Sequence, residues 1–166
     1  DMELAGSDME LCSALTPETI AYICNHCPIP VYADPVSTVK ALKLQPVLHR
    51  LAAIKPNALE AECLTGQRDP ERAALALVDR GVQRVFISLG AQGMIAADKK
   101  ELLRLPGLAT RVVNSTGAGD AATAAIVLAG IRGMGLRDAA LLAQKAGAVT
   151  CRSESANAPE LANILD

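Results

Sequence analysis

The hydrophobic pattern of this chain alternates between short apolar runs and longer segments whose apolar positions recur at helical spacing. The short runs predict strands at 31–33, 53–55, 84–89, 93–97, 101–105 and 111–113. The longer segments predict helices at 17–26, 37–50, 57–64, 70–80, 118–131, 136–151 and 159–165. Strands separated by helices of this length form parallel βαβ units with right-handed crossovers. We therefore predict an α/β fold with three αβα layers around an open, mostly parallel sheet, and a local antiparallel hairpin within 93–105.

Composition narrows the class of protein. Of the 166 residues, 51% are apolar, so the chain can bury a sizeable core. The formal net charge is −2, which argues against a general nucleic-acid binder because such proteins need a basic face. The longest mainly apolar run, 121–131, is shorter than the ~20 residues of a membrane span, and we expect a buried helix there. We predict no nucleic-acid partner and no membrane partner. Neither a linker nor an internal repeat is evident, which predicts a single domain over 1–166.

The cysteines suggest a reducing compartment. There are five of them, an odd and scattered set, which indicates free thiols and a cytoplasmic location. Cys24 and Cys27 stand in a Cys-Asn-His-Cys segment that ends a predicted helix. A redox motif normally lies where a strand runs into a helix, and a zinc site needs about four ligands. A structural role is therefore favoured, with redox and metal-binding roles left as alternatives.

The segment 111–122 carries the most informative chemistry, because a predicted strand runs through a glycine turn into a helix. The glycines let a ligand approach the backbone, and the amides of Ala118, Gly119 and Asp120 are expected to be free donors that bind an anion such as phosphate. A carboxylate beside such a cradle repels phosphate, but it can accept a proton from an attacking hydroxyl. This pattern favours general-base phosphoryl transfer by Asp120.

Two other interpretations of this segment remain open. Residues 117–122 also fit the dinucleotide pattern G-x-G-x-x-G/A, which expects an acidic residue about 20 positions later at the end of a strand. Asp138 has that spacing, but it stands at a predicted helix start. The simplest alternative is a glycine turn in which Asp120 is only a first-turn acid.

Three segments resemble, in order, the motifs of the ribokinase-like (PfkB) carbohydrate kinases. Residues 114–120 (NSTGAGD) resemble the family's second signature, usually D-T-x-G-A-G-D. Residues 55–66 resemble its K-P-N-x-x-E segment, and 88–93 resemble its [ST]-L-G-x-x-G turn. The tail 148–159 is similar to the family's closing cation and nucleotide loop. Three motifs in the family's order are far more specific than a lone glycine pattern, so this resemblance implies a ribokinase-like fold and a kinase.

The resemblance assigns catalytic roles to the glycine turn. Asp120 corresponds to the catalytic base, while Gly117, Ala118 and Gly119 correspond to the anion hole. The family phosphorylates a sugar or nucleoside hydroxyl with ATP and Mg²⁺, so these are the cofactor and metal that the resemblance implies. The family usually has Phe where this chain has Ala122, which leaves a smaller packing group.

The resemblance also assigns nucleotide-binding positions. Asn57 and Glu60 correspond to the pair that organises Mg²⁺, water and the nucleotide phosphates, with Glu60 acting on the metal through water. The same two residues fit a capping box, and both roles can hold at once. Ser88, Gly90 and Gly93 match positions at the nucleotide.

A monovalent cation, K⁺ in the simplest case, is implied by the positions of Asn114 and Thr116 together with the loop 150–157. The expected ligands are backbone carbonyls, as in the family. The family's first signature Asp is Asn114 here, which removes one charge near that region.

The chain corresponds to the C-terminal half of the family, so the other half, with most of the sugar contacts and the lid, is expected to be absent. Residues 32–41 (YADPVSTVKA) are most similar to the pseudouridine kinases, which implies phosphorylation of the ribose 5′-hydroxyl of pseudouridine. The alternatives are a ribokinase-like sugar kinase and a non-catalytic nucleotide-binding fragment. Because half of an α/β domain leaves apolar surface uncovered, we also expect self-association, with a homodimer as the simplest form.

Overall fold

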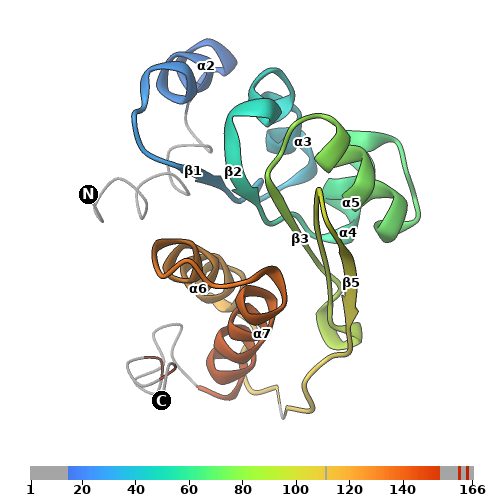
Figure 1. The fold of residues 1–166 in the computed structure, drawn as a ribbon. Coiled ribbons are helices and arrows are strands. Elements are labelled where there is room, and N and C mark those ends of the chain that lie inside the picture. The colour runs from blue at the N-terminus through green and yellow to red at the C-terminus, as the bar shows by residue number, and fades with distance from the viewer. Residues whose placement is uncertain (1–14, 111, 154–160, 162–163, 165–166) are drawn as a thin grey trace. The chain divides into compact units, whose positions relative to one another are not determined.

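The computed structural model describes residues 15–110, 112–153, 161 and 164. The described residues fall into two compact units (Figure 1). The first unit lies within 1–89 and 95–103, and the second within 90–94 and 104–166. The expectation that 1–166 forms one domain stays a prediction.

A five-stranded sheet with the order β1-β2-β3-β4-β5 organises the fold. Strands β1 (Val31–Ala33), β2 (Leu51–Ile54) and β3 (Arg84–Ser88) are parallel, as predicted. Strands β4 (Met94–Asp98) and β5 (Leu102–Leu105) form the predicted hairpin. Its turn is closed by Asp98, whose side chain accepts hydrogen bonds from the amides of Lys100 and Glu101 at 2.7 and 3.0 Å.

The helices of the first unit begin where the sequence carries capping residues. They are α2 (Pro17–His26), α3 (Thr38–Ala41), α4 (Ala58–Thr65) and α5 (Pro70–Asp79), which follow the N-caps Thr16, Ser37, Asn57 and Asp69. In each case the cap side chain accepts a hydrogen bond from an amide of the first turn, which is the reason these residue types favour helix starts.

The predicted helix at 37–50 is corrected by the structure. Only α3 is α-helical, and the chain continues as a 3₁₀ helix, η1 (Leu42–Arg50), that contains Pro46. Proline has no amide hydrogen, and its ring clashes with the carbonyl four residues earlier, so an α-helix cannot run through this position.

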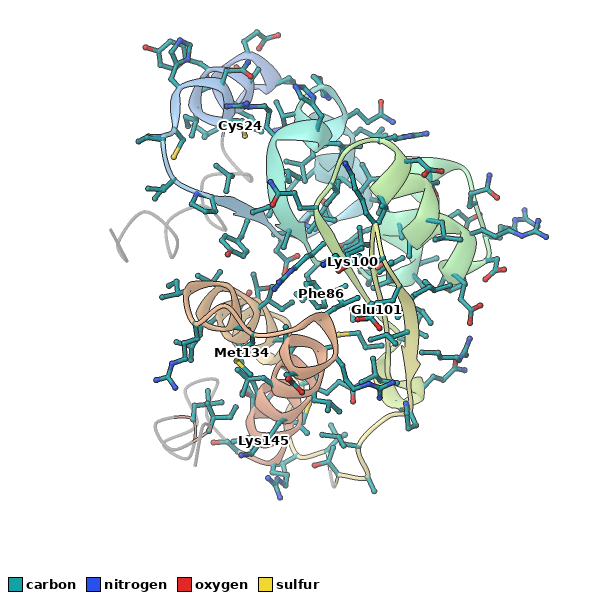
Figure 2. The ribbon with its side chains drawn as sticks, viewed as in Figure 1. Cys24, Phe86, Lys100, Glu101, Met134 and Lys145 are labelled. Carbon is teal, nitrogen blue, oxygen red and sulfur yellow. The ribbon has the colours of Figure 1, made fainter. Side chains whose placement is uncertain are left out.

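The core of the first unit is aliphatic except for one aromatic ring. Phe86 on β3 is fully buried, and Cys24 on α2 is 5% exposed (Figure 2). The largest fully buried aliphatic side chains around the sheet are Leu44, Leu51, Ile54, Leu64, Leu77, Ile87 and Ile95. Leu, Ile, Val and Ala therefore fill most of the core of this chain, in which only 2% of the residues are aromatic.

The second unit is built on two helices that pack against each other, α6 (Ala118–Ile131) and α7 (Leu136–Arg152). Their buried residues are mainly alanines, and a Cβ atom at Gly147 would lie 3.3 Å from the carbonyl oxygen of Ala118. Small residues therefore allow the close approach of these helices. The short 3₁₀ turn η2 (Gly90–Gln92) precedes β4.

The predicted strand at 111–113 is wrong for its described residues. Val112 and Val113 are exposed and lie outside any strand. The amide of Val113 donates instead to the carbonyl oxygen of Cys151, at 2.8 Å, so the end of α7 supplies the partner that a strand would have supplied. Arg111 and most of the predicted helix at 159–165 lie outside the described residues. Within the described part of the chain, no helix is both long and apolar enough to cross a membrane.

Candidate functional site

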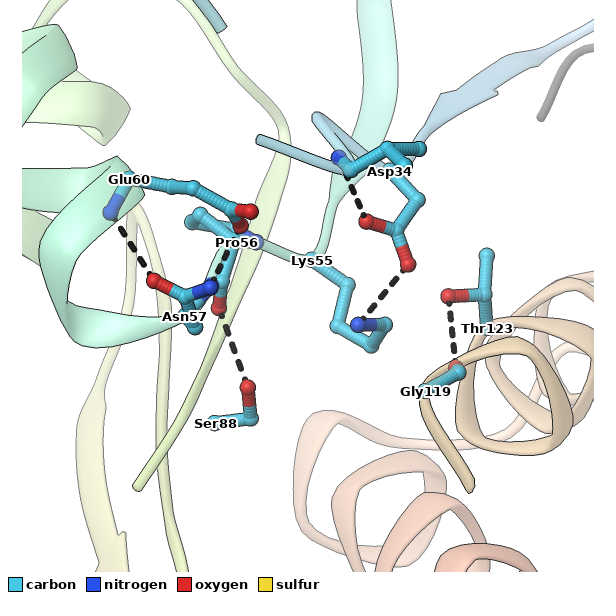
Figure 3. Close-up of polar contacts among 9 residues, drawn as sticks. Asp34, Lys55, Pro56, Asn57, Glu60, Ser88, Gly119 and Thr123 are labelled. Atoms are coloured by element: carbon cyan, nitrogen blue, oxygen red, sulfur yellow. Dashed lines mark hydrogen bonds and ion pairs between the residues drawn. The ribbon is translucent and has the colours of Figure 1, made fainter. Parts of the chain in front are cut away.

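Polar residues gather where the three parallel strands of the first unit end (Figure 3). Asn57 follows β2, and it forms an isolated parallel bridge with Ser88 at the end of β3. The amide of Ser88 donates to the carbonyl oxygen of Pro56 at 3.0 Å, and its hydroxyl donates to the same oxygen at 3.4 Å. The carboxyl edge of a parallel sheet is where ligands of α/β proteins usually bind, so this edge is the candidate site of the first unit.

The capping box predicted at the start of α4 is confirmed. Asn57 Oδ1 accepts from the Glu60 amide at 2.9 Å, and Glu60 Oε2 accepts from the Asn57 amide at 2.8 Å. Asn57 is exposed, whereas Glu60 is only 4% exposed. The cap therefore fixes the orientation of a buried carboxylate beside an accessible amide.

A buried ion pair next to this cap was not predicted from the sequence. Lys55 Nζ lies 2.8 Å from Asp34 Oδ2, and the two side chains are 7% and 9% exposed. The signal was present, because Asp34 directly follows β1 and Lys55 directly follows β2, and carboxyl ends of paired parallel strands meet at one edge. Burial of two charges is costly unless they pair, which explains the short contact.

The pKa of Glu60 depends on its burial and on its neighbours Asp34, Asn57 and Lys55. Burial raises the pKa of its carboxyl, and the neighbouring Asp34 carboxylate raises this pKa further. The hydrogen bond from the Asn57 amide and the positive charge of Lys55 act in the opposite direction. When Asp34 and Glu60 are both ionised, two negative charges lie near the single positive charge of Lys55. The net negative charge then favours the binding of a further cation.

A magnesium ion fits this edge only in a particular way. No group of three or more His, Cys, Asp or Glu side chains that could hold a metal occurs among the described residues. Mg²⁺ typically keeps several waters and binds through one or two carboxylates together with substrate phosphates. The residues present therefore fit an ion brought in with a nucleotide, with Glu60 acting through water, rather than a protein-built metal cage.

Gly90 and Gly93, in the turn after β3, differ in the space that is available for a side chain. A Cβ at Gly93 would lie 2.0 Å from the carbonyl oxygen of Leu105 and 2.7 Å from the amide nitrogen of Gly107, at a φ of +104°. Gly90 is exposed, with a φ of +58°, and a Cβ there would meet nothing within 4 Å. Backbone packing alone therefore explains glycine at 93, while the space beside Gly90 is open. Nucleotide binding at both positions stays a prediction.

The second unit carries a candidate site of its own, at the start of α6. Gly117 is the N-cap residue, with φ 81° and ψ −6°, a left-handed conformation that glycine adopts at little cost. The Ala118 amide donates to the carbonyl oxygen of Ser115 at 3.3 Å, which corrects the expectation that it is free. Within the part of the chain that the structure describes, the amides of Gly119 and Asp120 have no partner.

Asp120 stands in the first turn of α6, and its side chain is exposed. Thr123 Oγ1 donates to the carbonyl oxygen of Gly119 at 3.1 Å, which ties the first turn to the next one. An exposed carboxylate beside two unpaired helix-end amides can accept a proton while the amides hold an anion. The role of Asp120 as a base stays a prediction.

The loop that leads to this turn is held by local hydrogen bonds. Asn114 Oδ1 accepts from the Thr116 amide at 2.9 Å, and the Asn114 amide donates to the carbonyl oxygen of Cys151 at 3.2 Å. Asparagine can form this turn as well as aspartate, because its side-chain oxygen is also an acceptor. The proposed cation ligands at 114 and 116 remain predictions, and 154–157 of the associated loop lie outside the described residues.

The cysteine segment at the end of α2 is not part of a metal-binding cluster: among the described residues, no three or more His, Cys, Asp or Glu side chains are placed to hold a metal ion. Cys24 is buried in the core of the first unit, and Cys27 is the C-cap residue, whose amide donates to Ile23. Neither forms a disulfide, and among the other described cysteines Cys63 and Cys151 form none either. Packing and helix termination account for these two positions.

Comparisons with known proteins identify a family and a curated relative that this chain resembles. The sequence pattern of the pfkB family carbohydrate kinases matches residues 5–163. The chain is 32% identical over 160 residues to pseudouridine kinase of Escherichia coli K12, an alignment that covers 91% of this chain and 51% of that protein. The chain therefore spans about half the length of this curated relative.

Solved structures share the fold. A protein described as a sugar kinase from Clostridium perfringens matches with a TM-score of 0.83 and 28% identity, over 91% of this chain and 51% of that one. A protein described as ribokinase II from E. coli, in complex with ATP and Mg²⁺, matches with a TM-score of 0.74 and 21% identity, over 89% of this chain and 52% of that one. The predicted ribokinase-like α/β fold is confirmed.

Proposed function

This chain belongs to the pfkB family of carbohydrate kinases, and on that premise we propose that it supplies the nucleotide-binding and proton-accepting part of an ATP-dependent kinase. The observation that carries the proposal is the start of α6, where the exposed Asp120 carboxylate stands beside the unpaired amides of Gly119 and Asp120. A dinucleotide-binding role is disfavoured, because Asp138 lies in the first turn of α7 rather than at the end of a strand.

The reaction follows from these groups. The acceptor hydroxyl gives its proton to the Asp120 carboxylate, and its oxygen forms a bond to the γ-phosphorus of ATP. The bond from that phosphorus to the bridging β,γ oxygen breaks, and ADP leaves with the electron pair. The helix-end amides of Gly119 and Asp120 stabilise the negative charge of the transferring group. Mg²⁺ brought in with the nucleotide would supply positive charge at the phosphates, and Glu60 is the residue that would hold it, through water.

The acceptor in this proposal is the ribose 5′-hydroxyl of pseudouridine. Support comes from the segment 32–41 and from the 32% identity to a pseudouridine kinase. A ribokinase-like sugar kinase is the alternative acceptor class, and a nucleotide-binding fragment without turnover is the alternative for this chain alone, since it spans about half of its relative.

The decisive experiment compares two aspartates in matched positions. Asp120 and Asp138 are both exposed first-turn acids of helices that begin after glycine. In the protein at its natural length, Asp120→Asn should lower kcat by ~10²- to 10⁴-fold, the usual contribution of a general base. Asp138→Asn loses only a similar helix-dipole interaction, so its kcat should stay at the wild-type value.

A glycine variant separates proton transfer from binding. Gly119→Ala places a Cβ beside the anion cradle and should weaken ATP affinity, whereas Asp120→Asn should leave this affinity unchanged or improve it. Steady-state kinetics with pseudouridine and with ribose, and calorimetry with Mg-ATP, measure these effects. A kcat for Asp120→Asn within about threefold of wild type, far below the general-base range, would remove Asp120 from the role of base.

The remaining parts of the proposal concern partners and location. We infer binding of ATP, Mg²⁺ and a small sugar or nucleoside, K⁺ near Asn114 and Thr116, association with a second copy, and a cytoplasmic location. Free thiols at the described cysteines support the last point. Light scattering over a tenfold concentration range tests association, because a constant monomer mass would contradict it.

A further inference from the structure

Val36 has an unfavourable backbone conformation for its residue type. Its φ is +63°, and it is the one non-glycine residue with positive φ in the described part of the chain. A β-branched side chain is poorly tolerated there because its Cβ crowds the following carbonyl oxygen, whereas glycine or asparagine would adopt the same turn more easily. The choice of valine therefore strains this turn.

The turn itself does not depend on the valine side chain. The Val36 amide donates to Asp34 Oδ1 at 3.2 Å, and the Ser37 amide donates to the carbonyl oxygen of Pro35 at 2.7 Å, which closes a three-residue γ-turn. Asp34 is anchored by Lys55. Backbone groups and a buried ion pair thus hold the conformation.

The isopropyl group adds little to the core of the first unit, because the Val36 side chain is 50% exposed. Strained residues that the surrounding structure holds in place concentrate at binding and catalytic sites. Since valine strains the backbone and packs poorly, the reason for it is best sought in something that its side chain contacts outside the unit.

The position of the turn indicates what that contact is. The strand order β1-β2-β3 places the turn after β1, next to Asn57 and Glu60 after β2, with Ser88 beyond them at the end of β3. In the proposed function, Ser88 lies at the nucleotide, and Asn57 and Glu60 lie at its phosphates. The end of β1 then lies on the side of the phosphates away from the nucleotide, where an acceptor must approach.

We propose that the Val36 side chain contacts the acceptor, with its methyl groups packed against a nonpolar face of the sugar or base ring, and that it contributes to acceptor specificity. This inference rests on the proposed kinase function. It agrees with the sequence, since Val36 lies within 32–41, the segment that carries the similarity to one acceptor class.

The test uses variants that relieve the strain while they remove the isopropyl group. Val36→Asn and Val36→Gly both tolerate positive φ and keep the amide that bonds to Asp34. In the protein at its natural length, we expect the KM for the acceptor to rise by about tenfold, the scale for a lost apolar contact. The KM for ATP should change less than twofold, and the thermal midpoint of Val36→Asn should be equal to or above that of wild type.

The control is Val39→Asn, which changes another exposed valine, on α3, where valine and asparagine have similar helix propensities. It should leave both KM values unchanged. The inference is overturned if the acceptor KM of both Val36 variants equals that of wild type, if the KM for ATP rises instead, or if Val36→Asn is less stable than wild type. If wild type itself transfers no phosphate to any sugar or nucleoside, the proposed function fails, and this inference fails with it.

Discussion

Replacement of Asp34 by asparagine tests the buried ion pair at the edge of the sheet. Asparagine keeps the size of the side chain, and its oxygen can still accept from the Val36 amide. It removes the negative charge that lies 2.8 Å from Lys55 Nζ, in a place where the lysine side chain is 7% exposed. The ammonium group cannot reach water without local rearrangement, so the variant leaves a positive charge buried without its main counter-charge.

The expected loss of stability follows from this burial. Breaking a buried pair by removal of one partner typically costs ~3–5 kcal/mol. Lys55 also interacts with the Glu60 carboxylate, which compensates part of the loss. We therefore expect the lower end, about 3 kcal/mol, which lowers the thermal midpoint by roughly 6–12 °C for a chain of this size.

Chemical denaturation of wild type, Asp34→Asn, Lys55→Met and the double variant forms a complete thermodynamic cycle. The double variant should recover most of the stability, because replacement of both charges by neutral groups is often close to neutral. Circular dichroism before each titration serves as the control for folding. If Asp34→Asn costs less than about 1 kcal/mol, the value typical of an exposed pair, burial gives this ion pair no added weight in the stability of the fold.

Gly93→Ala should abolish folding or lower the thermal midpoint severely, because its Cβ would lie 2.0 Å from the Leu105 carbonyl oxygen. Gly90→Ala should cost only ~1–2 kcal/mol, the penalty for a left-handed backbone, because its Cβ would meet nothing within 4 Å. Equal thermal midpoints for the two variants would show that Gly93 is not required by backbone packing. Burial raises the pKa of Glu60, so its contribution to stability is present below the ordinary value of 4.5 and is lost as pH rises through the folded-state pKa. The free energy of unfolding of wild type should therefore fall relative to that of Glu60→Gln as the pH rises above the ordinary value of 4.5. A constant difference between the two proteins in denaturation experiments would show that burial does not destabilise the ionised carboxylate.

Local sequence signals determined much of the fold, because they act over one turn of chain. Thr16 and Pro17 begin α2, and Asn57 and Glu60 form the cap of α4, since these residues need only neighbours three positions away. The glycine turn before α6 is equally local, so its place at the start of a helix could be predicted together with Asp120.

Tertiary structure decided the features that depend on distant segments. Asp34 and Lys55 each directly follow a strand, but they pair only because β1 and β2 are parallel neighbours in the sheet. The expected strand through Val113 was lost because its amide bonds to the end of α7, which no local pattern reveals. The left-handed conformation of Val36 is equally non-local, because a β-branched residue adopts it only where the surrounding structure holds the backbone in place.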